Sequence, residues 1–208
     1  MNEVKPKVEI IAWTPNPEYV IETALLQCRE SVENLQKKRV KKEISERIKE
    51  IFMTNPPHLG VLEHASATFR VTGVSRAFSH QLVRHRIASY AQMSQRAVPV
   101  EKMGICIPQT FDAEDRTNYL TLVELSENLY KKLVNKSIPL EDARFCLLNG
   151  VETQVVITMN FRSWIHFLRL RLDRTAQWEI RFIAEEILRI LKSIAPNVFD
   201  EERMKYWE

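Results

Sequence analysis

The stretch ASATFRVTGVSRAFSHQLVRHR, residues 65–86, places an expected strand directly before an expected helix. Its first half alternates, so Phe69 and Val71 fall on one face of a strand that Gly73 ends. Ser75 then stands in a capping position, and the apolar residues after it have helical spacing. The sequence therefore predicts a strand and then a helix whose C-terminal end carries the triplet RHR.

Three other segments have clear strand or helix patterns, and they are residues 8–13, 36–53 and 175–195. The first predicts a strand, followed by a helix that Thr14 or Asn16 can cap with Pro17 near its first turn. The second predicts a helix whose isoleucines lie beneath a charged face, and we expect that face to be solvated. The third predicts a helix with an isoleucine stripe, which is ordinary core packing.

Residues 160–171 predict a helix with two stripes of different character. Arg162, His166 and Arg169 recur at i, i+4 and i+7 along one side. The second stripe consists of Asn160, Trp164, Phe167 and Arg171. An arginine aligned with aromatic rings either snorkels at the margin of the core, which is the commoner case, or reaches into a buried anion site.

Length and composition limit the class of protein. With 208 residues, 45% of them hydrophobic, the chain can bury a substantial core, and we expect a single domain over residues 1–208. Its 30 lysines and arginines nearly balance 27 aspartates and glutamates, so neither nucleic acid nor an anionic membrane is an expected partner. Cys28, Cys106 and Cys146 are widely spaced without a CxxC pair, which favours a reduced, cytoplasmic setting. No signal segment and no membrane-spanning run are expected.

The triplet Arg84 to Arg86 has two interpretations. Basic side chains at a helix end complement the helix dipole, and this role alone explains many such clusters. Three consecutive helical residues are about 100° apart, so we expect at least one guanidinium to face the protein or a bound anion. The polar residues 87–96 predict a loop that displays hydrogen-bond donors. Together these features favour a receptor for a phosphate and a polar ring.

Several familiar chemistries are missing from the sequence. The chain has 4 glycines and neither a GxGxxG nor a GxxxxGK[ST] motif, so side chains must hold any phosphate. The segment HLGVLEH lacks HExxH spacing, and no metal site is expected. No serine, cysteine or histidine stands in a known nucleophile motif. Covalent catalysis by the protein is therefore not indicated.

The segment RHRIASYAQMS, an RHR followed by seven residues and a serine, resembles the signature of the flavin-dependent thymidylate synthases. The resemblance continues through EDARFCLLNGVETQ and MNFRSWIHFLRLRLDRTAQWEIR, and it covers most of residues 56–185. It implies an α/β (α+β) fold with an antiparallel sheet flanked by helices. It also implies a homotetramer whose active sites, shared between subunits, hold FAD.

The resemblance also implies which residues form the site. The residues that would contact FAD are Gly60, Arg84, His85, Arg86 and Gln92, with Asn160, Arg162 and His166 of another subunit. The residues that would hold dUMP are Gln81, Arg84, Gln92, Met93, Ser94, Gln95, Arg96, Arg144 and Arg171. Arg171 would be the catalytic residue, because a fixed positive charge stabilises negative charge developing on the uracil ring.

The implied reaction transfers a one-carbon unit from methylenetetrahydrofolate to dUMP, with reducing equivalents from NADPH passing through FAD. The sequence departs from the family pattern at Gln92, where some members have glutamate, and also at Gly60, Ala97 and Leu148. A glutamine cannot act as a base, so a carboxylate role at residue 92 is in doubt. Two alternatives remain open: a basic nucleic-acid-binding module, and an inactive homologue that keeps the fold.

Overall fold

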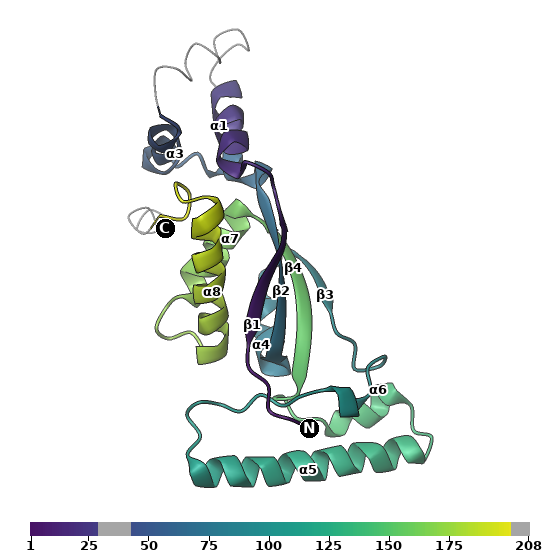
Figure 1. Ribbon diagram of the computed structural model, residues 1–208. Coiled ribbons are helices and arrows are strands. Elements are labelled where there is room, and N and C mark those ends of the chain that lie inside the picture. Colours follow the sequence, from purple (N-terminus) through teal and green to yellow (C-terminus); the bar gives the residue numbers. More distant parts are fainter. Residues whose placement is uncertain (29–42, 201–208) are drawn as a thin grey trace. The chain divides into compact units, whose positions relative to one another are not determined.

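The computed structural model describes residues 1–28 and 43–200. Its strands, in sheet order, are β1 (Lys7–Trp13), β2 (Ser66–Ser75), β4 (Glu152–Asn160) and β3 (Ser89–Gln92). Neighbouring strands run in opposite directions (Figure 1). The prediction of an α+β fold with an antiparallel sheet is therefore confirmed.

The chain divides into two compact units, which are described separately below. The first unit comprises Met1–Lys7, Arg70–Arg84 and Tyr90–Val156. The second unit comprises Val8–Phe69, His85–Ser89 and the residues from Ile157 onward. The single domain expected over residues 1–208 stays a prediction.

Strand β2 follows the alternation of its sequence. Phe69 and Val71 are fully buried, whereas Arg70 is exposed. The predicted end of the strand at Gly73 is wrong, because β2 continues to Ser75. Gly73 has a φ of 66°, and a Cβ atom there would overlap the carbonyl oxygen of Lys5. The glycine thus allows a close approach of two backbone segments instead of ending the strand.

The helical segments of the second unit are α1 (Pro17–Gln27), α3 (Ile44–Met53), the 3-10 helix η1 (Leu59–His64), α7 (Phe161–Arg171) and α8 (Trp178–Ile194). Asn16 occupies the N-cap of α1 and Pro17 begins the helix, as predicted. Within the described residues, the Asn16 side chain makes no capping hydrogen bond to α1. The Thr14 hydroxyl does not cap the helix either, because it accepts a hydrogen bond from the Ser66 amide at 2.9 Å. Asn16 therefore occupies the N-cap position without a side-chain hydrogen bond to the helix.

Helix α8 begins later than the expected Thr175. The Gln177 side chain accepts hydrogen bonds from the amides of Glu179 and Ile180, at 3.1 and 3.2 Å, and so caps the helix. The first three members of the isoleucine stripe are fully buried, at positions 180, 183 and 187. Only the last, Ile194, is partly exposed. The stripe therefore packs the core, as its spacing predicted.

The core of the second unit centres on Trp164 of α7, which is fully buried. Its ring meets Phe69 of β2 edge-on at a centroid distance of 5.1 Å and Phe167 at 5.6 Å. The Trp164 indole donates to the carbonyl oxygen of Ala67 at 3.1 Å, which satisfies the polar atom of a buried ring. These contacts fix α7 on one face of the sheet.

Helix α3 contradicts the expected charged, solvated face at one residue. Ile48 and Ile51 are buried, as the spacing predicted, but the Arg47 side chain is also buried, with 5% of its surface exposed. It forms an ion pair with the equally buried Glu22 of α1. Residues 36–42 of the predicted helix lie outside the described residues.

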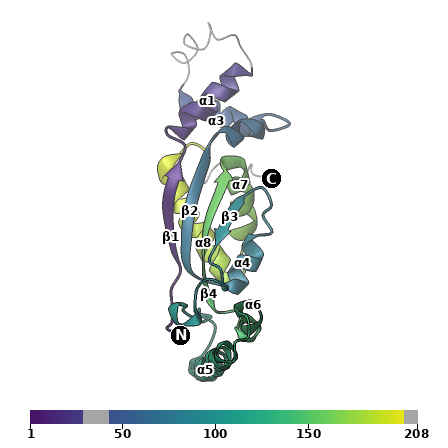
Figure 2. The same ribbon diagram turned by 90° about the vertical axis from the view of Figure 1, so that its right-hand side faces the viewer.

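The helical segments of the first unit are α4 (Arg76–Leu82), η2 (Val100–Lys102), α5 (Ala113–Asn135), α6 (Leu140–Ala143) and η3 (Arg144–Cys146). Ser75 caps α4, because its hydroxyl accepts from the Phe78 amide at 3.0 Å, as predicted. No helix in the described part of the chain is long and apolar enough to cross a membrane. The sheet and its neighbouring helices are seen from a second side in Figure 2.

Two predictions about the segment after α4 are wrong. Helix α4 ends at Leu82, so the triplet RHR follows the helix and does not form its last turn. The Tyr90 hydroxyl donates to the Leu82 carbonyl oxygen at 3.0 Å and satisfies a carbonyl at the helix end. Residues 87–96 are not a loop throughout, because Ser89–Gln92 form the edge strand β3.

Candidate active site

The triplet Arg84 to Arg86 alternates between solvent and protein. Arg84 and Arg86 are exposed, whereas His85 is buried, with 7% of its surface accessible. Neither guanidinium of the triplet is buried against the protein, so the expectation that one of them faces a bound anion stays a prediction. The buried member of the triplet is His85, whose imidazole packs edge-on against Phe167 with ring centroids 5.0 Å apart.

A hydrogen bond joins two predicted site residues within the second unit. The Nε of Arg171 donates to the Nε2 of His85 at 2.9 Å. Arginine has no acceptor, so Nε2 carries no proton and the neutral ring carries its proton on Nδ1. The sequence left open whether Arg171 snorkels or reaches inward. The structure shows the half-buried guanidinium held against the imidazole.

The surroundings of His85 keep the ring uncharged. Burial lowers the pKa of His85 from 6.5 to about 4, assisted by the positive charge of Arg171 and by His166. The His166 ring lies 5.9 Å from the His85 ring, centroid to centroid. At neutral pH the second unit therefore presents a fixed arginine charge beside a neutral histidine.

We expect the protein to lose stability as the pH falls from about 6.5 toward 4. In that window the unfolded chain protonates His85 whereas the folded chain does not, so the free energy of unfolding rises with pH. We expect a loss of roughly 1–3 kcal/mol, measured by urea unfolding at pH 7 and pH 4.5. A His85→Gln variant should show a flatter dependence. An NMR titration that places the His85 pKa near 6.5 would contradict this assignment.

The second stripe of α7 is divided between the core and its two ends. Asn160 lies at the N-cap, where its side-chain oxygen accepts from the Ser163 amide at 2.8 Å. Its carbonyl group is thus already used, and its amide group is the part that can donate to a ligand. The other stripe is exposed, and there the Arg162 guanidinium meets the Glu63 carboxylate at 2.6 Å. Glu63 is a residue whose role the sequence did not indicate.

Gly60 lies exposed in η1, and a Cβ atom added there would meet no atom within 4 Å. A larger residue such as serine or threonine would therefore fit without rearrangement. Packing therefore does not explain why this chain has glycine at residue 60. A ligand contact at residue 60 would be made by the backbone.

The predicted nucleotide loop belongs to the first unit and is held by β4. The Gln92 amide donates to the Thr153 hydroxyl at 3.0 Å, and the Met93 amide donates to the Gln154 carbonyl oxygen at 2.8 Å. The Ser94 hydroxyl accepts from the Arg96 amide at 3.1 Å. Strand pairing thus fixes the start of the loop and leaves Ser94 exposed.

Two predicted substrate residues meet at Glu141 in the same unit. Its carboxylate lies 3.8 Å from the Arg96 guanidinium, and its backbone oxygen accepts from Arg144 at 3.1 Å. Burial lowers the pKa of Arg76, and the nearby charge of Arg144 lowers it further. Arg76 and Glu141 are therefore neighbours that the sequence analysis missed, because neither stands in a recognised motif. Gln81, on α4, is half-buried.

The cysteines occupy positions with little nucleophilic character. Burial raises the pKa of Cys146, and its thiol donates to the Ala143 carbonyl oxygen at 3.1 Å. Cys106 is buried, and its thiol lies 3.5 Å from the Gly73 carbonyl oxygen. Cys28 is exposed at the end of α1. The burial of Cys106 and the raised pKa of Cys146 both disfavour the thiolate that a nucleophilic cysteine needs.

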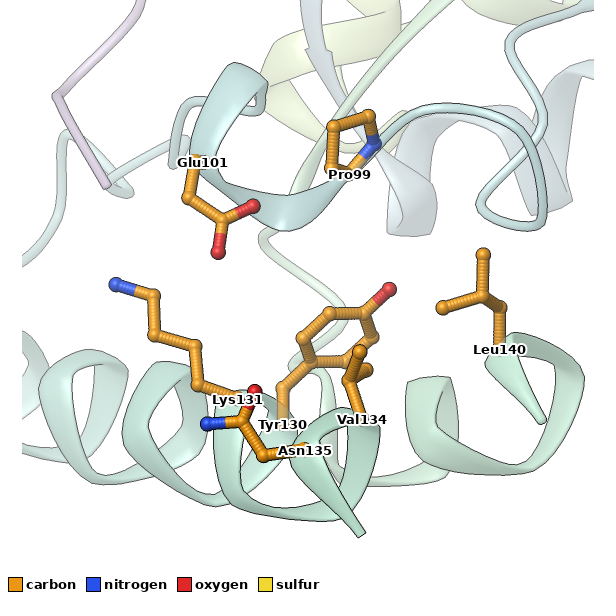
Figure 3. A pocket seen from close by; sticks show the side chains of 7 residues that line it. All are labelled: Pro99, Glu101, Tyr130, Lys131, Val134, Asn135 and Leu140. Atoms are coloured by element: carbon orange, nitrogen blue, oxygen red, sulfur yellow. The ribbon is translucent and has the colours of Figure 1, made fainter. Parts of the chain in front are cut away.

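Two pockets of the described structure lie away from the predicted site residues. In the first unit a pocket of about 280 Å³ lies between η2 and α5, with Pro99 above Tyr130 and Glu101 facing Lys131 (Figure 3). In the second unit a pocket of about 610 Å³ is lined by residues that include Trp13, Tyr19 and Ile194. No predicted site residue lines either pocket, so both are separate from the arginine and histidine clusters described above.

Comparisons with known proteins identify the family. Residues 9–197 match the family model described as "Thymidylate synthase complementing protein". A flavin-dependent thymidylate synthase of Geobacter sulfurreducens is 41% identical over 199 residues, which cover 93% of this chain and 85% of that protein. Proteins of the same name from Sulfolobus acidocaldarius and Pyrococcus furiosus are 37% and 36% identical, over 93% and 90% of this chain and 75% of each relative. The chain belongs to the flavin-dependent thymidylate synthase family.

Proposed function

We propose that this protein converts dUMP to dTMP, with methylenetetrahydrofolate as one-carbon donor and NADPH as reductant acting through FAD. The observation that carries the proposal is the contact between Arg171 and the neutral His85 in a chain of this family. This contact places a fixed positive charge next to an imidazole that can still donate a hydrogen bond from Nδ1. Enzymes of this kind leave the redox chemistry to the cofactor and supply orientation and charge.

The donors of the second unit fit a flavin. Arg86, Arg162 and His166 are exposed and cationic or polar, which suits the diphosphate of FAD. The Nδ1–H of His85 and the side-chain amide of Asn160 can donate to polar ring atoms. The backbone at Gly60 would complete this set. Arg84 and Gln92, which belong to the first unit, are proposed as flavin contacts on the family resemblance alone. A bound flavin would pass reducing equivalents from NADPH toward the nucleotide.

The first unit supplies most of the proposed nucleotide contacts, which are Gln81, Arg84, Gln92, Met93, Ser94, Gln95, Arg96 and Arg144. The contact between Arg96 and Glu141 is exposed and long, at 3.8 Å, so it contributes little to stability. A phosphate dianion would displace the Glu141 carboxylate from Arg96, because it carries more charge and more acceptor oxygens. Arg171 would direct its guanidinium to the uracil ring and stabilise the charge that develops there.

The proposal includes a homotetramer with active sites shared between subunits, a single functional domain and a cytoplasmic location. Its support is that Arg84, Arg86, Ser94, Arg96 and Arg162 are exposed in one chain. Ligands held by such open side chains need further walls to exclude water. A second subunit would supply them.

The decisive experiment combines dUMP, methylenetetrahydrofolate, NADPH and FAD with the purified protein. We expect NADPH oxidation that depends on dUMP and matches the dTMP formed, as measured by absorbance at the NADPH band and by chromatography of the nucleotides. An inactive homologue would bind flavin without forming dTMP. A nucleic-acid-binding module would bind no flavin and would show salt-dependent affinity for nucleic acid. Either result would overturn the proposal.

The double variant His85→Ala/Arg86→Ala is expected to be colourless after purification and weakly active even with added FAD. Loss of the imidazole donor and of an exposed guanidinium would weaken flavin affinity, which we expect to fall by at least about tenfold. The measurement is the flavin absorbance per protein and the FAD titration. The matched control is Arg169→Ala, an exposed arginine of α7 outside the proposed site, which should keep its flavin. Equal flavin content in both variants would contradict the proposed role of the triplet.

A further inference from the structure

The hydroxyl of Tyr130 is the polar end of a deeply buried side chain in the first unit. The residue is 3% exposed, and it packs in an apolar cluster with Val100 and Ala143. Within the part of the chain that the structure describes, no hydrogen bond joins this hydroxyl to another residue. Burial raises the pKa of Tyr130, and the charge of Glu101 raises it further, so the hydroxyl keeps its proton. A buried hydroxyl without a partner in the protein is costly, and it points to a ligand that supplies one.

The same side chain lines the pocket of about 280 Å³ between η2 and α5. Figure 3 shows the Tyr130 hydroxyl pointing into the space between Pro99 and Leu140. Val134 adds a third apolar side chain at this end of the pocket. The volume is at the lower limit of ligand pockets, so a ligand here would be small. Its buried end would have to combine an apolar body with one group that hydrogen-bonds to Tyr130.

The other end of the pocket carries a carboxylate that is not paired with a positive charge. Lys131 lies opposite Glu101 in Figure 3, but its ammonium group donates to the Glu127 carboxylate at 2.7 Å. Glu101 is exposed, and among the described residues it forms no ion pair or hydrogen bond. Asn135 lies beside Lys131, and its side-chain oxygen can accept. The acceptors available at this end therefore favour a cation over an anion.

We propose that this pocket binds a small amino alcohol, in which a primary ammonium group and a hydroxyl group end a short apolar chain. The ammonium group donates to the Glu101 carboxylate and to the Asn135 oxygen, because it has three donors and no acceptor. The apolar chain lies against Pro99 and Val134. The ligand hydroxyl pairs with that of Tyr130, since each can donate and accept. No residue proposed to bind FAD or dUMP lines the pocket, so the inference goes beyond the proposed reaction.

Other classes of small ligand fit the pocket less well. A carboxylate would have to displace Glu127 from Lys131, and the charge of Glu101 would repel it. A simple alkylamine would leave the Tyr130 hydroxyl without a partner. A diamine would place a second positive charge among apolar side chains, where loss of solvation is costly. The amino alcohol is the class that satisfies both ends of the pocket.

Ligand-observed NMR titrations of the purified protein test the ligand class with three linear probes of similar length. The probes are ω-aminopentanol, hexylamine, in which a methyl group replaces the hydroxyl, and ω-hydroxyhexanoate, in which a carboxylate replaces the ammonium group. We expect ω-aminopentanol to bind roughly fivefold more tightly than ω-hydroxyhexanoate, and more tightly than hexylamine. The same order is expected with and without dUMP and FAD, which separates this site from the proposed reaction. Tighter binding of the carboxylate, or no binding of ω-aminopentanol, would overturn the proposal.

The variant Glu101→Gln tests the ammonium end of the pocket. It keeps the size of the side chain and removes the charge, so we expect the affinity for ω-aminopentanol to fall roughly fivefold. The matched control is Glu114→Gln, an exposed residue of α5 that lies about 25 Å along the helix from Lys131. This control should bind the probe as the native protein does. An equal loss in both variants, or no loss in Glu101→Gln, would contradict the assignment.

The variant Tyr130→Phe tests the hydroxyl end, because it removes one oxygen atom and leaves the ring in place. We expect it to bind hexylamine at least as tightly as ω-aminopentanol, which reverses the order seen with the native protein. Its Tm should stay the same or rise by up to roughly 3 °C, since no hydrogen bond within the protein is lost. The control Tyr90→Phe loses the hydrogen bond to the Leu82 carbonyl oxygen, and its Tm should fall. An unchanged probe order in Tyr130→Phe, or a fall in its Tm as large as that of Tyr90→Phe, would overturn the inference.

Discussion

The variant Arg171→Ala is expected to form dTMP at least about a hundredfold more slowly than the native protein, while it remains folded and keeps much of its flavin. The Arg171 side chain is half-buried and held by His85, so its charge is oriented before any substrate arrives. Charge stabilisation by a group that is already in place is usually the largest single contribution to catalysis. Removal of the guanidinium takes away that contribution, whereas the exposed arginines proposed to hold flavin are unchanged.

Two further variants separate this role from a structural one. Arg171→Lys keeps a positive charge but has no planar Nε–H donor, so we expect only partial recovery of turnover. Arg169→Ala removes a neighbouring exposed arginine of the same helix and should leave turnover unchanged. In Arg171→Ala the pKa of His85 should also rise from about 4, because one charge that lowers it is gone. Native-like dTMP formation in Arg171→Ala would refute the catalytic assignment.

The parts of the fold that the sequence predicted correctly depend on local patterns. The alternation around Phe69 and the Ser75 cap are properties of a few neighbouring residues, and both appear in the structure. The predicted end of α4 was wrong. The helix stops at Leu82, whose carbonyl oxygen accepts a hydrogen bond from Tyr90, eight residues further along the chain. The prediction that Arg47 is solvated was wrong because its ion-pair partner, Glu22, lies 25 residues away in the sequence. Contacts between distant residues leave no periodic signal.

The candidate site shows the same division. The family resemblance named Arg171 as a substrate residue and His85 as a cofactor residue, and it indicated nothing about a contact between them. The structure joins them directly through the 2.9 Å hydrogen bond, which depends on how α7 packs over the segment after α4. The residues that the sequence missed, such as Glu63 and Glu141, act by pairing with arginines already suspected. A carboxylate pairs with such an arginine because of where the fold places it, and no sequence motif indicates this pairing.

The largest expected effect on stability is that of Arg47→Ala. This side chain and its partner Glu22 are both about nine-tenths buried or more, and they join α3 to α1 within the second unit. Removing one member of a buried ion pair leaves the other charge without compensation in a poorly solvated place. We therefore expect the free energy of unfolding to fall by about 3–5 kcal/mol, measured by urea denaturation at pH 7.

Two comparisons show whether burial of the pair is the cause. Arg116→Ala breaks the ion pair with Glu3, which is exposed on both sides, and should cost less than about 1 kcal/mol. The double variant Glu22→Leu/Arg47→Met replaces both charges by apolar groups of similar size, and it should recover most of the loss. A cost at Arg47 no greater than that at Arg116 would show that the buried pair contributes little. Recovery in the double variant would show instead that α1 and α3 need their shapes to match more than they need the charges, since the unpaired carboxylate accounts for the damage in the single variant.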